Sequence, residues 1–133
     1  MLGYLLDTNV VLRLAFQRET LGVRLLEMLA TEPLYISQVC ALEMAIKTSI
    51  GKLPLPPPFS TNFAIGFSEM ARELKAGVLA IDLGHIDTLS HLPLHHRDPF
   101  DRLIIAQALT EELTLVSSDR VFASYPGLKV LGA

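Results

Sequence analysis

The sequence has a single cysteine and no long apolar run, and both shortages exclude whole classes of protein. One cysteine, Cys40, cannot form an intrachain disulfide or a cysteine-based metal cluster, which suits a reducing cytoplasm. No apolar stretch is long enough to span a bilayer, and Asp7 interrupts the first one too early for a signal peptide. We therefore expect a cytoplasmic protein that has no membrane segment.

The sequence also has no excess of basic residues. The formal net charge is −3, whereas nucleic-acid-binding proteins usually carry a basic surface. Several cations nevertheless lie within a few residues of the acids considered below, so a basic rim around an acidic centre is compatible with the sequence. They are Arg13, Lys47, Arg97, Arg102 and Arg120.

Half of the residues are hydrophobic and only 19% are charged, which excludes a disordered chain. The length suits one domain, spanning residues 1–133, with a buried core. We expect strands at residues 4–6, 34–36, 78–81, 113–116 and 128–131, and helices at residues 10–16, 20–30, 38–50, 62–76, 82–89 and 99–108. This alternation predicts an α/β fold, a three-layer α/β/α sandwich with a central, mainly parallel sheet.

The stretch from His95 to Ala108 carries the clearest helix-start signal. Asp98 suits the N-cap, Pro99 suits the first helical position, and Asp101 follows the cap by three residues. The residues after them are apolar on nearly every face, which predicts a buried, central helix. The two carboxylates therefore lie at the positive end of a helix, where they either only cap it or also belong to a functional site.

In the helix predicted at residues 38–50, Glu43 lies beside a stripe of apolar residues that recur at helical spacing. The members of the stripe are Val39, Leu42, Ile46 and Ile50. The ordinary interpretation of Glu43 is a surface ion pair with Lys47, about one helical turn later. A functional interpretation depends on other acids that reach the same place.

Three further acids lie where predicted strands end or where a helix begins at the same edge. Asp7 ends the first strand, Asp119 follows the fourth, and Asp101 lies at the start of its helix. In open parallel sheets, ligands bind outside the carboxyl ends of the strands. Glu43 follows the second strand by about two helical turns and can reach this edge. We therefore expect Asp7, Glu43, Asp101 and Asp119 to form one acidic site.

Such a site indicates a divalent cation. Clustered carboxylates repel each other by about 4 kcal/mol per close pair at an effective dielectric constant of about 20, so either their pKa values rise or a cation lies among them. Ligation by oxygen alone is typical of Mg²⁺ or Mn²⁺. The chemistry that this favours is phosphodiester hydrolysis, in which one or two ions activate water and stabilise charge on the phosphate.

Other chemistries have weaker support. His95 and His96 could be metal ligands, general acids or structural residues. Ser117 and Ser118 could be nucleophiles, but the sequence arranges no histidine and acid around them. A phosphoaspartyl hydrolase would need a second aspartate two residues after Asp7, and asparagine stands there. No glycine-rich dinucleotide fingerprint follows the first strand.

In their order along the chain, these motifs resemble those of the PIN-domain ribonucleases and, more narrowly, the VapC-type toxins of toxin–antitoxin pairs. The resemblance covers almost the whole chain. Its most specific part is the block at residues 96–108, His-Arg-Asp-Pro-Phe-Asp-Arg followed by Leu-Ile-Ile-Ala-Gln-Ala. The other parts are residues 5–10, Glu43 with residues 45–47, residues 51–53, and residues 113–116 followed by Asp119.

The resemblance implies a Mg²⁺-dependent endoribonuclease, with Mn²⁺ as a possible substitute, that acts as the toxin of such a pair. It implies that the metal is bound by Asp7, Glu43, Asp101 and Asp119. Asp98 is interpreted chiefly as the helix cap, with a supporting role at the site. The other residues that would support the ligands or contact the RNA are Thr8, Asn9, Arg97, Ser117 and Ser118.

The resemblance also implies partners. Proteins of this kind act on RNA, usually form homodimers, and are inhibited by a cognate antitoxin whose C-terminal segment wraps the toxin and blocks the acidic pocket. The groove for the antitoxin would be lined by residues 10–30 and 62–76. The sequence departs from the family pattern at Leu42, where tryptophan is common, at Glu112, where a glycine often closes the central helix, and at Ser117, where threonine is common.

Two functions of other classes stay open. A non-catalytic module with the same fold would bind a protein partner without cleaving RNA. A metal-dependent phosphatase would act on small phosphate esters. The complete set of four acids favours the nuclease over the binding module.

Overall fold

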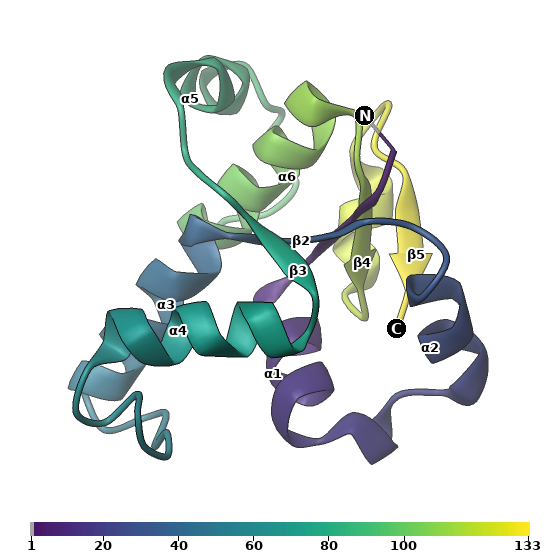
Figure 1. Ribbon diagram of the computed structural model, residues 1–133. Coiled ribbons are helices and arrows are strands. Elements are labelled where there is room, and N and C mark those ends of the chain that lie inside the picture. The colour runs from purple at the N-terminus through teal and green to yellow at the C-terminus, as the bar shows by residue number, and fades with distance from the viewer. Residues whose placement is uncertain (1) are drawn as a thin grey trace.

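The computed structural model describes residues 2–133 and has a central sheet of five parallel strands (Figure 1). The strands are β1 (Tyr4–Leu6), β2 (Leu34–Ser37), β3 (Ala76–Leu79), β4 (Thr114–Ser117) and β5 (Val130–Gly132). They lie in the order β3-β2-β1-β4-β5, and every neighbouring pair is parallel. The predicted α/β sandwich is confirmed, and its sheet is parallel throughout rather than mainly parallel.

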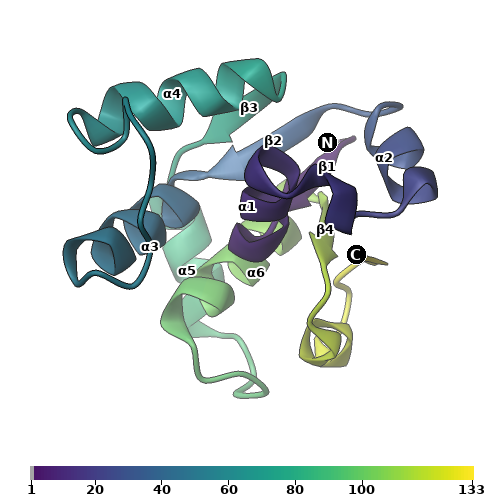
Figure 2. The ribbon, with the colours of Figure 1, turned by 90° about the horizontal axis from the view of Figure 1, so that it is seen from below.

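Helices cover both faces of this sheet. They are α1 (Thr8–Phe16), α2 (Val23–Leu29), α3 (Gln38–Ser49), α4 (Phe63–Glu73), α5 (Leu83–Ser90) and α6 (Pro99–Glu111), with the 3₁₀ helices η1 (Arg18–Thr20) and η2 (Arg120–Ser124). In Figure 1, α5 and α6 lie above the sheet and α1, α2 and α4 lie below it, and Figure 2 shows α1 in front of β1 when seen from below. Within residues 2–133, no helix is both long and apolar enough to span a membrane.

The core lies on both faces of the central strands, and α6 fills much of one side. Leu5 of β1 and Leu115 of β4 are fully buried, as expected for parallel strands that are covered on both faces. In α6, Ile104 and Ile105 are fully buried, and the helix contacts α3, α5 and β4. The prediction that this helix is central and buried is therefore confirmed. Its fixed position holds the acids of its first turn at one edge of the sheet.

The helix predicted at residues 20–30 starts later than expected, at Val23. Gly22 takes the N-cap position, and the chain before it forms η1 instead. The guanidinium group of Arg13 stabilises η1, because it donates to the hydroxyl oxygen of Thr20 at 2.9 Å and to the carbonyl oxygen of Thr20 at 2.7 Å. The start of α2 therefore depends on a contact between η1 and α1.

The helix predicted at residues 62–76 ends at Glu73, and the next strand starts at Ala76 rather than at residue 78. The sequence predicts Gly77 as the helix stop, but Lys75, with a φ angle of 56°, makes the turn. Gly77 lies within β3 and pairs with Tyr35 of β2. A Cβ atom on Gly77 would lie 3.3 Å from the Tyr35 ring, so the glycine makes room for that ring.

The apolar stripe on α3 faces solvent, with Leu42, Ile46 and Ile50 exposed by 48%, 42% and 60%. Only Val39 of that stripe is buried. The helix packs against α1 and α6. Its other buried side chains are Cys40, Glu43 and Met44. The acid on this helix is therefore turned toward the interior.

Candidate metal centre

Asp7 follows β1 at the carboxyl edge of the sheet and caps α1. Its Oδ1 accepts a hydrogen bond from the Val10 N–H at 2.9 Å, and its Oδ2 accepts one from the hydroxyl of Ser117 at the end of β4. Burial raises the pKa of the Asp7 carboxyl, and the charges of Glu43 and Asp119 raise it further, whereas the two hydrogen bonds lower it. The Asp7 carboxylate is therefore close enough to Glu43 and Asp119, which lie in distant parts of the chain, to be repelled by their charges.

Glu43 lies on α3, and both of its carboxylate oxygens have partners. The Thr8 hydroxyl donates to Oε1 at 2.7 Å, and the Lys47 ammonium group lies 2.7 Å from Oε2. The hydrogen bond to Glu43 raises the pKa of Lys47, so the lysine stays charged at neutral pH. The predicted pair with Lys47 exists, but it is not a surface pair, because Glu43 is only 6% exposed.

The first turn of α6 holds two acids in different surroundings. Asp98 is the N-cap, and its Oδ1 accepts hydrogen bonds from the N–H groups of Phe100 and Asp101 at 2.8 and 3.3 Å. The carboxylate of Asp101 instead lies 2.9 Å from Nε2 of His96. Burial raises the pKa of Asp101 to about 6, the charge of Asp98 adds to the rise, and His96 opposes it.

Asp119 follows β4 and caps η2, where its Oδ1 accepts a hydrogen bond from the Val121 N–H at 3.0 Å. Its backbone N–H donates to the hydroxyl oxygen of Ser117 at 3.0 Å, and the same hydroxyl donates to Asp7. Its Oδ2 lies 3.5 Å from Nε2 of His96. Ser117 and His96 therefore each connect Asp119 to another acid of the group.

These acids meet in one cavity of about 270 Å³, although they come from four separate segments of the chain. Ser117 does not line this cavity, but its hydroxyl donates a hydrogen bond to Asp7, which does. Arg97, His95 and His96 do not line it either. The His95 ring packs against Tyr125, with 5.1 Å between the ring centroids. The lining residues are Asp7, Thr8, Asn9, Leu12, Glu43, Lys47, Asp98, Asp101, Ser118, Asp119 and Phe122.

Two residues contact the acids more closely than the sequence indicates. The sequence does not distinguish the roles of His95 and His96, yet only His96 lies beside Asp101 and Asp119. Lys47 is the only cation among the residues that line the cavity. The sequence indicates only that His96 lies two residues before the N-cap of α6, and therefore near the N-terminus of that helix.

A second group of possible metal-binding side chains lies between α5 and α6. His85 is fully buried, its Nδ1 accepts a hydrogen bond from the Asp82 N–H at 3.2 Å, and its Nε2 lies 3.0 Å from Glu111. The Asp82 carboxylate accepts a hydrogen bond from the His85 N–H at 3.0 Å, which completes a capping box at the start of α5. Both ring nitrogens have protein partners, so we interpret this group as structural.

The donor set of the acidic cavity fits a divalent cation. Carboxylate oxygens are the usual protein ligands of Mg²⁺ and Mn²⁺. Nε2 of His96 and one carboxylate oxygen each from Asp101 and Asp119 lie within 4.8 Å of one another. This Nε2 atom lies 2.9 Å from Oδ2 of Asp101 and 3.5 Å from Oδ2 of Asp119, so two carboxylates already lie beside it. A cation would offset the repulsion that contributes to the raised pKa values of Asp7 and Asp101.

Asp101→Asn is expected to raise the melting temperature of the metal-free protein at neutral pH. The Asp101 pKa is raised from 3.8 to about 6, so between these values the folded protein binds more protons than the unfolded chain. Stability is therefore lost as the pH rises through this window, and asparagine avoids the loss. Thermal unfolding in EDTA should show a gain that is largest above about pH 6 and shrinks toward about pH 4. The exposed Asp87→Asn is the control, and a gain independent of pH would contradict the explanation.

The comparison with protein families gives an assignment over most of the chain: the model described as the PIN domain matches residues 4–128. The comparison with curated protein sequences found no match.

Several solved structures have a similar fold. A chain of VapBC2 from Rickettsia felis, bound to a DNA fragment from its promoter, has a TM-score of 0.73 and 19% identity, with 99% of this chain and 98% of that chain covered. DNA-bound VapBC from Salmonella typhimurium has a TM-score of 0.69 and 19% identity over the same shares. VapBC-5 from Mycobacterium tuberculosis has a TM-score of 0.60 and 17% identity, again with 99% and 98% covered. At these identities the likeness shows the fold.

Proposed function

The chain belongs to the PIN domain family, and from this premise we propose that it is a metal-dependent endoribonuclease that acts as the toxin of a toxin–antitoxin pair. The observation that carries the proposal is the convergence of carboxylates from four segments in one cavity of about 270 Å³. Buried like charges destabilise a fold unless a counter-ion lies among them. The similarity to chains of VapBC complexes supports the role as a toxin.

We assign metal binding to Asp7, Glu43, Asp101 and Asp119, with Mg²⁺ as the ion and Mn²⁺ as a substitute. When bound, such an ion supplies activation of a water nucleophile and neutralisation of charge that develops on the phosphate. The residues of the chain supply the geometry. The Ser117 hydroxyl orients Asp7, the Thr8 hydroxyl orients Glu43, and the Asp98 cap holds the start of α6 so that Asp101 faces the cavity.

Other groups are available for the RNA. Asn9 and Ser118 line the cavity and offer hydrogen bonds to phosphate or ribose oxygens. Lys47 offers a positive charge at the cavity, since its side chain is 48% exposed even while it pairs with Glu43. Arg97 is exposed next to the α6 cap and can contact the RNA backbone outside the cavity.

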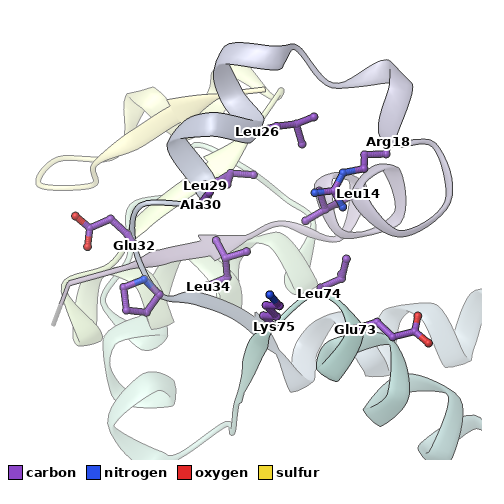
Figure 3. Close-up of a pocket in the computed structure, with 11 residues that line it drawn as sticks. Leu14, Arg18, Leu26, Leu29, Ala30, Glu32, Leu34, Glu73, Leu74 and Lys75 are labelled. Atoms are coloured by element: carbon purple, nitrogen blue, oxygen red, sulfur yellow. The ribbon is translucent and has the colours of Figure 1, made fainter.

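The surface proposed for the antitoxin is a groove of about 380 Å³ between α1, α2 and α4 (Figure 3). Most of its lining comes from the two segments that the family resemblance assigns to the antitoxin, residues 10–30 and 62–76. Leucines form its apolar part, and the charges of Arg18, Glu32, Glu73 and Lys75 surround them, an arrangement that suits an amphipathic segment. The leucines are Leu14, Leu26, Leu29, Leu34 and Leu74. Homodimer formation stays a prediction from the resemblance.

The test of the proposed function is RNA cleavage by the purified protein. Total RNA is incubated with the protein and Mg²⁺ or Mn²⁺, and the new ends are mapped by sequencing. We expect discrete internal cleavage sites that disappear when EDTA is present. Expression without the antitoxin should arrest growth, and co-expression should relieve the arrest. Intact RNA under all metal conditions would contradict the proposal.

The two other functions lead to different results in the same assays. A phosphatase would hydrolyse a phosphate monoester and leave RNA intact. A binding module would cleave neither substrate and would bind its partner equally well after Asp7→Asn. The buried acids argue against the binding module, because a surface that only binds a protein has no need for carboxylates whose pKa values are raised by burial.

A further inference from the structure

We propose that Lys47 is an exchangeable counter-ion of the metal centre, a cation that pairs with Glu43 when no metal ion is bound and with an RNA phosphate once Glu43 binds an ion. The inference rests on the proposed metal-dependent function. It goes beyond that function because it makes ion binding and RNA binding depend on each other through one ion pair. The observation that carries it is the contact between the cation that lines the cavity and one of the proposed ligands.

Both carboxylate oxygens of Glu43 have partners within the chain. The Thr8 hydroxyl donates to Oε1 at 2.7 Å, and the Lys47 ammonium group lies 2.7 Å from Oε2. An ion about 2.1 Å from Oε2 would lie about 4 Å from the ammonium nitrogen, which is close enough for strong repulsion between two cations. Lys47 and a metal ion therefore compete for Glu43.

The lysine is the partner that can move. Its side chain is 48% exposed, whereas Glu43 is buried and fixed by packing. Lysine carries its charge on a flexible four-carbon stem, so the ammonium group can shift while α3 keeps its place. The charges of Asp98 and Asp101 contribute to the raised pKa of Lys47, so its ammonium group is close to the acids of α6 as well as to Glu43.

An RNA phosphate suits the released ammonium group. Five carboxylates and a single cation, Lys47, are among the residues that line the cavity. A phosphate that enters such a cavity needs a positive charge beside it, and lysine commonly binds phosphate as a point charge. Asn9 and Ser118 line the same cavity and offer hydrogen bonds without a charge. Lys47 is therefore the side chain of the cavity that can neutralise the phosphate.

This exchange makes the ion and the RNA strengthen each other's binding. Ion binding at Glu43 separates the carboxylate from Lys47 and leaves the ammonium group available to the phosphate. Phosphate binding holds the ammonium group away from Glu43 and leaves the carboxylate available to the ion. Coupling of this kind is reciprocal, so each ligand should raise the affinity for the other by the same factor.

The first test is a double-mutant cycle in Mn²⁺ binding, measured by calorimetry without RNA. Lys47→Met removes the charge and keeps most of the length of the side chain, and it should raise Mn²⁺ affinity by about tenfold. In a Glu43→Gln background the same change should have little effect, because no carboxylate is released. Lys52→Met, at an exposed lysine that does not line the cavity, is the matched control and should change the affinity little.

The outcomes of this cycle separate the inference from the proposed function. An equal gain in both backgrounds would show that Lys47 repels the ion only at a distance, and it would overturn the exchange. Equal Mn²⁺ affinity in Lys47→Met and the wild-type protein would also overturn the exchange and leave the proposed function standing. Failure of the wild-type protein to bind Mn²⁺ or Mg²⁺ would overturn the metal centre itself.

The second test uses the wild-type protein alone, so it stays valid even if Lys47→Met does not fold. The protein is acetylated with and without Mn²⁺, and the modification of each lysine is followed by mass spectrometry. The contact of 2.7 Å with Glu43 should protect Lys47, so Mn²⁺ should speed its modification several-fold relative to Lys52. An unchanged ratio between the two lysines would contradict the release.

Cleavage kinetics test the transfer to the phosphate. Lys47→Met should reach its half-maximal rate at a lower Mg²⁺ concentration than the wild-type protein, and at saturating Mg²⁺ its KM for RNA should be about tenfold higher. A merely structural role for Lys47 would not lower the Mg²⁺ requirement. An unchanged KM would overturn the contact with the phosphate.

Discussion

Asp7→Asn should reduce the rate of metal-dependent RNA cleavage by about a thousandfold or more, which corresponds to about 4 kcal/mol of transition-state stabilisation. The variant removes a charged side chain, which we propose as a metal ligand, in the part of the cavity where β1 and β4 end. Its side-chain oxygen can still accept the hydrogen bond from the Val10 N–H, so the cap of α1 is kept. The pKa of Asp7 is raised by burial, so a neutral side chain of the same shape should not destabilise the fold.

The measurement is the initial rate of cleavage of a defined RNA at saturating Mg²⁺, together with the melting temperature of both proteins. Asp87→Asn makes the same chemical change on the exposed side of α5 and should cleave at the wild-type rate. Wild-type activity in Asp7→Asn would remove this carboxylate from the mechanism. A lower rate accompanied by a lower melting temperature would show that the residue is needed for folding instead.

Leu26→Glu should weaken binding of the cognate antitoxin by about a hundredfold, equivalent to about 2.7 kcal/mol. Leu26 points into the groove between α1, α2 and α4, beside Leu29 (Figure 3). A carboxylate at this position would have to lose its water when the antitoxin covers it, and an apolar anchor would be lost at the same time. The groove and the acidic cavity share no lining residue, so RNA cleavage by the free protein should be unchanged.

Calorimetry with the proposed antitoxin measures the affinity, and growth after co-expression shows the consequence in cells. Val23→Glu is the matched control, since it adds the same charge to an apolar position of α2 that is exposed and does not line the groove. Equal loss of affinity in both variants would point to a general effect of negative charge. Unchanged binding in Leu26→Glu would place the antitoxin elsewhere on the surface.

The fold could be predicted wherever the signal is local. Asp98 and Pro99 start α6 as expected, because a cap and a fixed φ angle act on the neighbouring backbone alone. The ends of other helices depend on contacts with distant residues. Gly77 leaves space in β3 for the ring of Tyr35, and the turn before the strand is made at Lys75, whose φ angle is 56°. The spacing of residues 62–81 cannot predict this arrangement, because Tyr35 lies outside that segment.

The outward face of α3 shows the same limit. Leu42, Ile46 and Ile50 have the spacing of a buried stripe, yet the neighbours α1 and α6 cover the face that carries Glu43. A helical pattern indicates which residues share a face, but it does not say which face another helix will cover. The burial of the acid was therefore decided by packing.

The sequence by itself determined the order of the elements, the parallel sheet and the edge at which four acids collect, because strand ends and helix caps are properties of short segments. Tertiary structure alone decided which neighbours each acid has. Ser117 reaches Asp7 across 110 positions of the chain, and His96 comes between Asp101 and Asp119 only because α6 and the end of β4 lie side by side. Distances of this kind follow from how buried surfaces fit together, and that fit involves the whole chain at once.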